Sequence, residues 1–458
     1  MRNPLLVPDL RELIQAGETV VLRDFLTDHH PAQVAEILED LGPGEGDTIF
    51  GILPPRHRAD VLSYLDRERQ VQIVESMMPT EAAALLHLMS HDERADLVNR
   101  LDEDRVDQIL PHLAQAERDD IRRLASYEPG TAGAVMTTDY VTLPPHLTVR
   151  EALERLRHEA PDRETIYYSY VVDPRRRLIG IVSLRTLILA RPLARIEDIM
   201  RRDVIFARVD EDQEAVARQF AKYDLIAIPV VDASAMLLGI ITHDDAMDIL
   251  RREQTEDILA FGGVSSDAEA DEESYWQGRI IESVRRRTGW LLLLFAAGTI
   301  SGLVVDSFLW VRNKYPHIHF DIFMPLLMGT GGNAGSQTVG TIIRGLALGE
   351  IQQRDTLRVL VREWLTGVFL GLLLGCIGFA YTWLLQRQKP GFAAVIGLAI
   401  LGICMWANSV GALVPLLARK FGIDPALVSA PLISTLVDAT GLVIYYTIAL
   451  ALLSYLPC

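Results

Sequence analysis

Five long apolar stretches occupy the part of the chain that follows Gly289. A helix rises 1.5 Å per residue, so about 20 residues are needed to cross the roughly 30 Å hydrocarbon core of a bilayer. Stretches of this length predict an α-helical transmembrane bundle of five spans. They cover residues 290–308, 322–347, 365–385, 392–417 and 426–456.

The charges of the chain also divide at Gly289. Of the 61 Asp and Glu residues, 54 precede it and seven follow it, whereas the 44 Lys and Arg residues divide into 34 and ten. The first part therefore carries a formal charge of −20 and the second +3. This asymmetry indicates two parts in two different solvents. The acidic part repels phosphates, so the prediction is no nucleic acid partner and a preference for cations.

Basic residues in the short loops predict how the spans are oriented, because such loops stay in the cytoplasm. Nine lie on the side of the N-terminal part and four on the other: Arg285, Arg286, Arg287, Arg344, Arg354, Arg358, Arg362, Arg419 and Lys420, against Arg312, Lys314, Arg387 and Lys389. We expect a multi-pass protein of the cell (inner) membrane, with its N-terminus cytoplasmic and its C-terminus outside. No signal-peptide core precedes the acidic part, and the three cysteines lack the spacing of a disulfide framework or zinc site.

Asp438 lies in the middle of the fifth stretch. A carboxylate at that depth costs about 2.5–3.5 kcal/mol on insertion scales, so it should face a partner or a wet cavity. Helical spacing places Ser434, Pro431 and Leu427 on the same face, with Ala430 beside them. This small and polar stripe predicts an ion path. The alternative is a buried, protonated Asp438 that is hydrogen-bonded to a neighbouring helix.

The second stretch is rich in glycine between residues 325 and 338. It lacks the lysine and the preceding strand of a phosphate-binding loop. Glycines at this density let helices approach closely, or let a helix unwind inside a protein-lined cavity. Asn333 and Gln337 are four residues apart and share a helix face. Two amides at membrane depth predict a polar lining rather than packing alone.

Residues 136–250 contain an internal repeat with an offset of 59 residues, seen in 171–183 and 230–242. Each copy begins with Met-x-x-Asp and contains an amphipathic helical stretch before its apolar strands, which predicts two β-α-β-β-α units. The pattern resembles a tandem pair of CBS motifs. In that family, Gly-h-h-Ser/Thr-x-x-Asp/Asn (h, apolar) contacts the ribose of an adenine nucleotide. The second copy carries it as Gly239, Thr242 and Asp245, whereas Thr186 replaces the acid in the first. The resemblance implies at most one good nucleotide site per pair, with ATP as its ligand; the alternative is another role for Asp245.

Residues 25–127 have regularly spaced Leu, Ile and Val with Pro or Asp punctuation, and residues 58–69 recur at an offset of 36. This predicts stacked short helices in a superhelix. The fold class is therefore a multi-domain membrane protein with an all-α superhelical N-terminal domain, an α/β tandem CBS pair and a five-span bundle. The expected boundaries are 1–130, 131–250 (copies 136–199 and 200–250), a connecting helix and acidic linker at 251–287, and the pore domain at 288–458.

This order of parts resembles the MgtE family of magnesium channels over essentially the whole chain. The specific motifs are Gly331-Gly332-Asn333-Ala334-Gly335-x-Gln337 and Asp424-Pro425-Ala426…Asp438-x-x-Gly441. The resemblance implies a homodimer that carries Mg²⁺ between its subunits, with Asp438 as the ion-selecting carboxylate and Asn333 and Gln337 nearby. Ala430 stands where many members carry Asn or Gly.

The resemblance also implies that bound Mg²⁺ docks the cytoplasmic parts and closes the channel. The regulatory positions are acidic, apart from one backbone carbonyl. They are Asp92, Asp96, Asp212, Glu214, Ala221, Asp224, Asp245, Asp248, Glu253, Glu256, Asp257 and Asp424. The alternative is a solvated acidic surface that does not respond to Mg²⁺.

Other functions remain to be weighed against a magnesium channel. A CBS-regulated transporter of another divalent cation, such as Co²⁺, fits the same residues. An anion transporter needs basic residues deep inside the spans, and the sequence has none there apart from Arg344 near the end of the second stretch. A membrane enzyme needs a nucleophile or metal cluster, and the only candidate is His317-x-His319-x-Asp321 in an outer loop. The prediction is a transporter and not an enzyme.

Overall fold

The computed structural model describes residues 7–159, 164–265 and 280–454. These residues form two compact units, Met1–Glu253 and Gln254–Cys458, and the chain passes from one to the other within helix α15 (His243–Phe261). The acidic run predicted at 267–273 lies outside the described residues.

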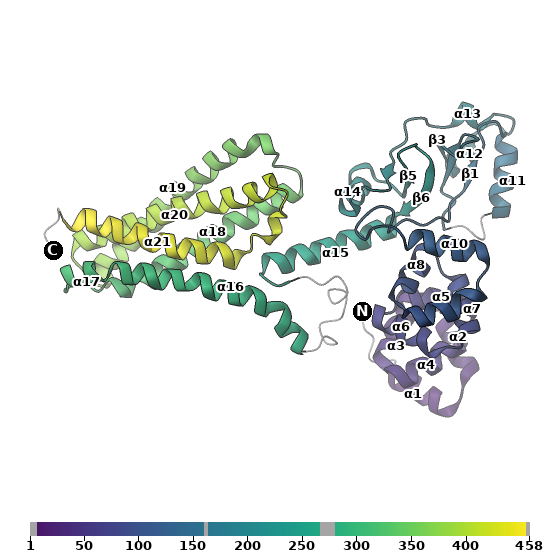
Figure 1. Cartoon of the computed structure of the whole chain (residues 1–458), viewed down its shortest axis with the longest axis horizontal. Helices are drawn as coiled ribbons and strands as arrows, with labels where there is room; N and C mark the ends of the chain where they lie inside the picture. Colours follow the sequence, from purple (N-terminus) through teal and green to yellow (C-terminus); the bar gives the residue numbers. More distant parts are fainter. Residues whose placement is uncertain (1–6, 160–163, 266–279, 455–458) are drawn as a thin grey trace. The chain divides into compact units, whose positions relative to one another are not determined.

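Short helices of seven to eleven residues build the first part of unit 1 (Figure 1). Proline at the first or second position begins α3, α4, α5 and α7, where its missing N–H costs no helical hydrogen bond. The helices are α1 (Val7–Ala16), α2 (Thr19–Thr27), α3 (Pro31–Leu41), α4 (Pro43–Ile52), α5 (Pro55–Ser63), α6 (Arg67–Ser76), α7 (Pro79–Leu88), α8 (His91–Arg100), α9 (Glu103–Ile109) and α10 (Gln115–Leu124). They share one apolar core, which confirms the predicted helical domain.

Two arginines of the 36-residue repeat bind the ends of preceding helices. The Arg58 guanidinium donates to the carbonyl oxygens of Gly51 (2.6 Å) and Leu53 (3.2 Å), at the end of α4. Arg105 donates to the Val74 carbonyl (2.8 Å), at the end of α6. Helix ends leave carbonyl groups without partners, so these side chains stabilise the stacking of one helix pair on the next.

Two three-stranded sheets follow, with the orders β1-β2-β3 and β4-β5-β6. Their elements are β1 (Thr142–Leu143), α11 (Val149–Glu159), β2 (Tyr168–Val172), β3 (Leu178–Ser183), α12 (Leu184–Leu189), α13 (Ile196–Ile199), β4 (Ala207–Arg208), α14 (Gln213–Tyr223), β5 (Ala227–Val231) and β6 (Leu237–Thr242). Val171 pairs with Gly180, and Val230 pairs with Gly239. The two β-α-β-β-α units therefore have the same register, as the 59-residue repeat predicts.

A glycine of each repeat packs against a methionine of the other repeat. A Cβ atom at Gly239 would lie 2.7 Å from the sulfur of Met136, and one at Gly180 would lie 2.7 Å from the sulfur of Met200. Met136 begins the first repeat and Met200 the second, so the strands of each repeat pack against the start of the other. Only glycine fits at such distances.

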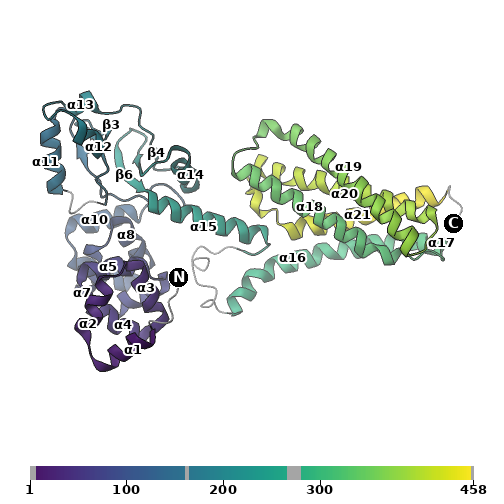
Figure 2. The same ribbon diagram turned by 180° about the vertical axis from the view of Figure 1, so that it is seen from behind.

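Unit 2 is a bundle of long helices (Figures 1 and 2). They are α16 (Ile280–Ser307), α17 (Leu309–Lys314), α18 (Met324–Ala347), α19 (Thr356–Ala380), α20 (Pro390–Lys420) and α21 (Ala430–Leu453), with a π-helical turn at Tyr381–Leu385 and short 3₁₀ turns at Phe320–Phe323, Gln353–Asp355 and Pro425–Leu427. Among the residues that the structure describes, four segments are long and apolar enough to cross a membrane: Ile280–Lys314, Gln353–Leu385, Pro390–Lys420 and Ala430–Leu453.

The remaining predicted span is α18, and its 24 residues reach about 36 Å. Its Gly, Thr, Asn and Gln residues make it less apolar than the other four. It packs against α20 and α21, which bury Gly335 and Thr338 but leave Asn333 and Gln337 exposed. The helix runs through its glycines without a break, so they serve close packing rather than unwinding.

Glycines also bring α19 and α20 into backbone contact. A Cβ atom at Gly375 would lie 2.5 Å from the carbonyl oxygen of Gly397, and one at Gly371 would lie 2.9 Å from the Cα of Leu401. Without a hydrophobic force between helices in lipid, such close packing is a main source of association.

We expect Gly375→Ala to destabilise the bundle, because the added methyl group forces the two backbones apart. Overpacking of this kind costs about 1–3 kcal/mol. Thermal unfolding in detergent measures the loss. Gly298→Ala is the matched control, since nothing lies within 4 Å of a Cβ atom at that position of α16. Equal melting temperatures for the two variants would contradict the tight α19–α20 contact.

Candidate functional site

Asp438 lies on α21, which begins where Ser429 accepts a hydrogen bond from the backbone N–H of Leu432 (3.3 Å). The Asp438 side chain is half-buried. Within residues 280–454, no hydrogen bond or ion pair reaches its carboxylate. The hydrogen-bonded partner that the alternative interpretation requires is therefore absent from the described part of this chain. Leu427 lies in the 3₁₀ turn before α21, so the predicted stripe starts at Pro431 and not at Leu427.

The face of α18 that meets α21 consists of small residues. A Cβ atom at Gly332 would lie 2.4 Å from the hydroxyl oxygen of Ser434, so the two helices cross in close contact there. One turn further along α18, the Ser336 hydroxyl donates to the backbone carbonyl of Ala430 (3.1 Å). These contacts place the start of α21 and the Ser434 position against α18.

The two amides predicted from the sequence lie beside this face. Asn333 and Gln337 are each one residue further along the helix than Gly332 and Ser336, and both side chains are exposed in the single chain. They are thus available to a path that a second subunit completes. Ser336 was not predicted. Its signal in the sequence is a small hydroxyl four residues after Gly332, which puts both on one face.

The end of α15 reaches the same helices of unit 2. A Cβ atom at Gly340 of α18 would lie 3.5 Å from the ring of Phe261. Gly263, with φ of +70°, follows the end of α15, and a Cβ atom there would lie 3.7 Å from the Ser429 hydroxyl. Residues just after the helix therefore touch the start of α21, while Phe261 touches α18.

A second group of carboxylates is buried in unit 1, around the first turn of α8. The Oδ1 atom of Asp92 is buried and has no hydrogen-bond partner among the described residues. Burial raises the pKa of Asp92 well above its ordinary value, and the charges of Asp245 and Glu93 raise it further. Burial likewise raises the pKa of Asp245 to about 7, although the hydrogen bond from Thr242 opposes that increase. The ionised forms of these carboxyl groups are thus disfavoured, because the groups are buried and close to one another.

Glu164, an exposed residue of the loop before β2, lies near this group and was not predicted from the sequence. Desolvation by the surrounding protein raises its pKa to about 8, and the charges of Asp92 and Glu93 contribute to that increase. The pattern of this loop gives no sign of that desolvation. In the described part of the chain, no three His, Cys, Asp or Glu side chains are arranged closely enough to chelate a metal ion. The carboxylates interact through their charges but do not form a closed cage.

The predicted acidic positions of the second repeat have local structural roles. Asp212 accepts a hydrogen bond from the N–H of Ala215 (3.0 Å) at the start of α14, and Glu214 pairs with Arg218. Asp224 ends the helix with φ of +52°. The others are surface groups or helix positions. Asp96, Ala221, Asp248 and Asp424 are exposed, Glu253 accepts from the side chain of Gln213 (2.9 Å), and Glu256 and Asp257 lie on α15.

The predicted nucleotide motif forms the start of α15. Both the backbone N–H and the hydroxyl of Thr242 donate to the carboxylate of Asp245. In the first repeat, Ser183 and Thr186 share the equivalent hydrogen bond (2.8 Å) without a charge. Asp245 therefore serves as a helix cap in addition to its place among the buried carboxylates.

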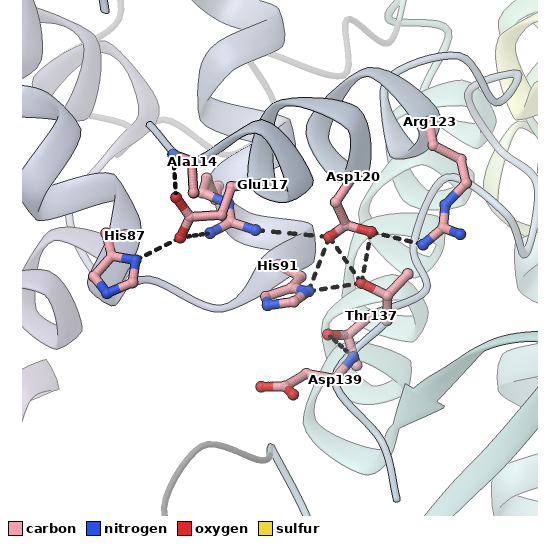
Figure 3. A network of polar contacts seen from close by, with 10 residues as sticks. His87, His91, Ala114, Glu117, Asp120, Arg123, Thr137 and Asp139 are labelled. Atoms are coloured by element: carbon pink, nitrogen blue, oxygen red, sulfur yellow. Dashed lines mark hydrogen bonds and ion pairs between the residues drawn. The ribbon is translucent and has the colours of Figure 1, made fainter. Parts of the chain in front are cut away.

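A polar network fixes α8 on the neighbouring elements (Figure 3). The buried Arg94 guanidinium lies 3.7 Å from Glu117 and 3.6 Å from Asp120, both on α10. The Nδ1 atom of His91 contacts Asp120 (2.9 Å) and the Thr138 hydroxyl (2.6 Å). Although burial opposes ionisation, hydrogen bonds from His91 and Thr138 lower the pKa of Asp120. This network, also missed from the sequence, holds the first turn of α8 and thus Asp92 in place.

Three family models match the chain. The model described as the MgtE divalent cation transporter covers residues 324–448, and the MgtE intracellular N domain covers residues 29–130. The CBS domain model matches twice, at 132–192 and 196–252.

Known proteins resemble the chain over most of its length. It is 39% identical over 457 residues to the magnesium transporter MgtE of Thermus thermophilus, which covers 98% of each chain. It is 33% identical over 427 residues to the magnesium transporter MgtE of Bacillus subtilis, covering 91% of this chain and 93% of that protein. The solved cytosolic domain of the Mg²⁺ channel MgtE in complex with ATP is 38% identical, with a TM-score of 0.51, and covers 53% of this chain and 100% of that one. A crystal structure of the soluble part of a magnesium transporter is 34% identical, also with a TM-score of 0.51, and covers 54% of this chain and 97% of that one.

Proposed function

This chain belongs to the MgtE family of divalent cation transporters, and on that premise we propose that it is a homodimeric Mg²⁺ channel closed by cytoplasmic Mg²⁺. The observation that carries the proposal is Asp438. Its carboxylate lies within a membrane-spanning helix and has no partner among residues 280–454. Such a residue is costly to insert into a membrane and is by default functional.

The chemistry of Mg²⁺ suits this arrangement. Mg²⁺ holds its waters tightly and is usually bound by one or two carboxylates with waters retained. One subunit supplies one carboxylate, Asp438, on a face of small residues. Twofold symmetry brings two copies together, which gives two carboxylates for one largely hydrated ion. Gly332 and Ser336 let α18 and α21 pack closely beside this face, and the exposed amides of Asn333 and Gln337 add hydrogen-bonding groups for the hydration shell.

The acidic group of unit 1 supports the regulatory half of the proposal. The buried Oδ1 of Asp92 lacks a partner, and Asp245 and Glu164 have raised pKa values. These groups fit a divalent cation. Without a cation, bound protons neutralise part of their charge, and a bound cation would neutralise that charge instead. Asp92 and Asp245 are the residues that would hold it. Since α15 carries Asp245 at its start and Phe261 at its end, we propose that binding acts through this helix on α18 and α21.

ATP is the second ligand that the CBS pair suggests, at Gly239, Thr242 and Asp245. The same Asp245 carboxylate is bound by Thr242 and belongs to the acidic group. We therefore propose that ATP binding and cation binding compete for, or share, this carboxylate.

Mg²⁺ flux into proteoliposomes tests the proposed function. We expect wild-type protein to carry Mg²⁺, and chemical cross-linking in the same membranes to give a dimer. Competing Co²⁺, Mn²⁺ and Ni²⁺ distinguish a magnesium channel from a transporter of another divalent cation. Flux of Co²⁺ with none of Mg²⁺ would replace the proposed substrate, and a conducting monomer would overturn the shared path.

Mg²⁺ binding to the acidic group should release protons near neutral pH. Asp245 and Glu164 have raised pKa values, so the closely packed arrangement holds protons that separated carboxyls would lose. The packed form is therefore favoured as pH falls through about 8 and 7 and disfavoured as pH rises. We expect on the order of one proton per chain to leave on Mg²⁺ addition at pH 7, and almost none at pH 9.5, where both groups are ionised. A pH-sensitive dye in weak buffer measures the release; an equal release at both pH values contradicts the assignment.

A further inference from the structure

Two buried polar side chains form a hydrogen bond between α18 and α20. The Thr338 hydroxyl donates to the Oδ1 atom of Asn408 over 2.6 Å, and the Nδ2 atom of Asn408 donates to the carbonyl of Cys404 (2.8 Å). The exposed fractions of the two residues are 4% and 2%. The Asn408 amide therefore has both a donor and an acceptor satisfied inside the bundle.

Thr338 differs in this respect from most other hydroxyl residues of the bundle. Ten of these, within residues 280–454, donate to a carbonyl oxygen three or four residues earlier in their own helix, which is the usual arrangement for Ser and Thr in a membrane helix. They are Thr288, Thr299, Ser307, Thr330, Thr341, Thr366, Ser409, Thr435, Thr440 and Thr447. Thr338 gives up that local bond for a bond to a second helix.

The hydrogen bond lies at a very close approach of the two helices. A Cβ atom at Gly411 of α20 would lie 2.7 Å from the carbonyl oxygen of Gly335 and 3.1 Å from the Cβ of Thr338. Close packing at Gly335 fixes the distance between the helices. Packing of glycines alone does not fix the rotation of α18 about its own axis. The hydrogen bond from Thr338 to Asn408 fixes that rotation.

The rotation of α18 matters because Thr338 is next to the residues that face the proposed ion path. Gln337 precedes it, and Ser336, which bonds to Ala430 of α21, lies two residues before it. Side chains extend about 5–6 Å from a helix axis, so a rotation of about 20° moves them by about 2 Å. A displacement of that size exceeds the tolerance of a site that orders hydration waters.

Helix α20 also contacts α21 beside Asp438. The Nε1 atom of Trp406 donates to the Thr440 hydroxyl (2.8 Å), and Thr440 lies two residues after Asp438. Trp406 and Asn408 are themselves two residues apart. One short segment of α20 thus bonds to both helices of the proposed path.

We propose that Asn408, acting through Thr338, is a positioning residue for ion selection, which holds α18 in the rotation that turns Ser336 toward Ala430 of α21 and leaves Gln337 facing the proposed ion path. The inference rests on the proposed Mg²⁺ transport. Neither Asn408 nor Thr338 contacts the ion.

The test compares the full-length protein with Thr338→Val and Asn408→Leu in proteoliposomes. Both substitutions keep the approximate volume and remove the hydrogen bond. We expect each to reduce the ratio of Mg²⁺ flux to Ca²⁺ flux by about threefold, the factor that corresponds to one hydrogen bond between membrane helices. The two residues act as one unit, so the double variant should show the same reduction and not its square.

Two further variants separate positioning from stability. Thr338→Ser keeps the hydroxyl and should retain the wild-type ratio. Thr330→Val, on the same helix, removes a hydroxyl that bonds only to Leu326 of α18 and should also retain it. Thermal unfolding of each variant in detergent is measured alongside the flux.

A merely structural role predicts a lower melting temperature and less active protein at an unchanged flux ratio. That result for Thr338→Val, the smallest of the changes, overturns the inference while the proposed function stands. Reductions that multiply in the double variant also overturn it. A wild-type protein that carries no Mg²⁺ overturns the proposed function itself.

Discussion

We expect an Asp438→Asn protein to fold, to insert as a dimer and to carry no measurable Mg²⁺. The substitution keeps the shape of the side chain and removes only its charge, so the small-residue contacts of α21 with Gly332 and Ser336 remain. A divalent ion about 5 Å from a unit charge gains about 6–7 kcal/mol at an effective dielectric constant of about 20, before its desolvation is subtracted. Loss of that attraction from both subunits should reduce flux by at least about a hundredfold.

Mg²⁺ uptake by proteoliposomes at matched protein content measures this loss. Asp306→Asn is the matched control, because it neutralises a carboxylate at the end of another membrane helix, α16, that has no role in the proposed path. We expect it to conduct like the wild type. Wild-type flux through Asp438→Asn would show that the negative charge is not what attracts the ion, and the proposed path would have to be abandoned.

Neutralising Asp92 and Asp245 together should remove most of the inhibition by cytoplasmic Mg²⁺. A ligand shifts an equilibrium only by its differential affinity for the two states. These two carboxylates repel each other, and a divalent cation between them favours the packed form. In the Asp92→Asn, Asp245→Asn protein, Mg²⁺ no longer favours the packed form. The Mg²⁺ concentration that halves the flux should therefore rise by about tenfold or more.

The measurement is Mg²⁺ flux as Mg²⁺ is raised on the side of the acidic domains, together with tryptic cleavage at Arg251 and Arg252 of α15. In the wild type, Mg²⁺ should reduce both flux and cleavage. Asp210→Asn is the matched control, since Asp210 pairs with Arg208 on the surface of the same repeat. Unchanged inhibition in the double variant would support a solvated acidic surface with no regulatory role.

The sequence predicts the elements of this protein well because their signals are local. Hydropathy and length identify the membrane helices, and the 59-residue repeat predicts the equal registers of Val171 with Gly180 and of Val230 with Gly239. Even α18, with its low hydropathy, is recognised by length and by glycines that need protein neighbours.

Tertiary neighbours are what the sequence does not reveal. Asn333 and Gln337 stand out as the two amides in the middle of α18, whereas the structure turns Gly332 and Ser336 toward α21, because the rotation of a helix is set by what it packs against. Glu164 appears as an ordinary loop acid, and only the packing of α8 nearby brings it under the influence of the charges of Asp92 and Glu93. The contacts of Arg94 and His91 with Asp120 were missed for the same reason.

The reciprocal packing of Met136 with Gly239 and of Met200 with Gly180 has a consequence for biosynthesis. The first CBS repeat lacks part of its core until the last strand of the second has left the ribosome. Part of the helical domain's packing is also incomplete until then, since Ala95 and Leu124 share a core with Val216 and Ile241 of the second repeat. From Ala95 to Ile241, at about 5–20 residues per second, incomplete apolar surfaces stay exposed for roughly 7–30 s. We therefore expect a nascent chain of this protein to depend on chaperones until shortly before its first membrane helix emerges.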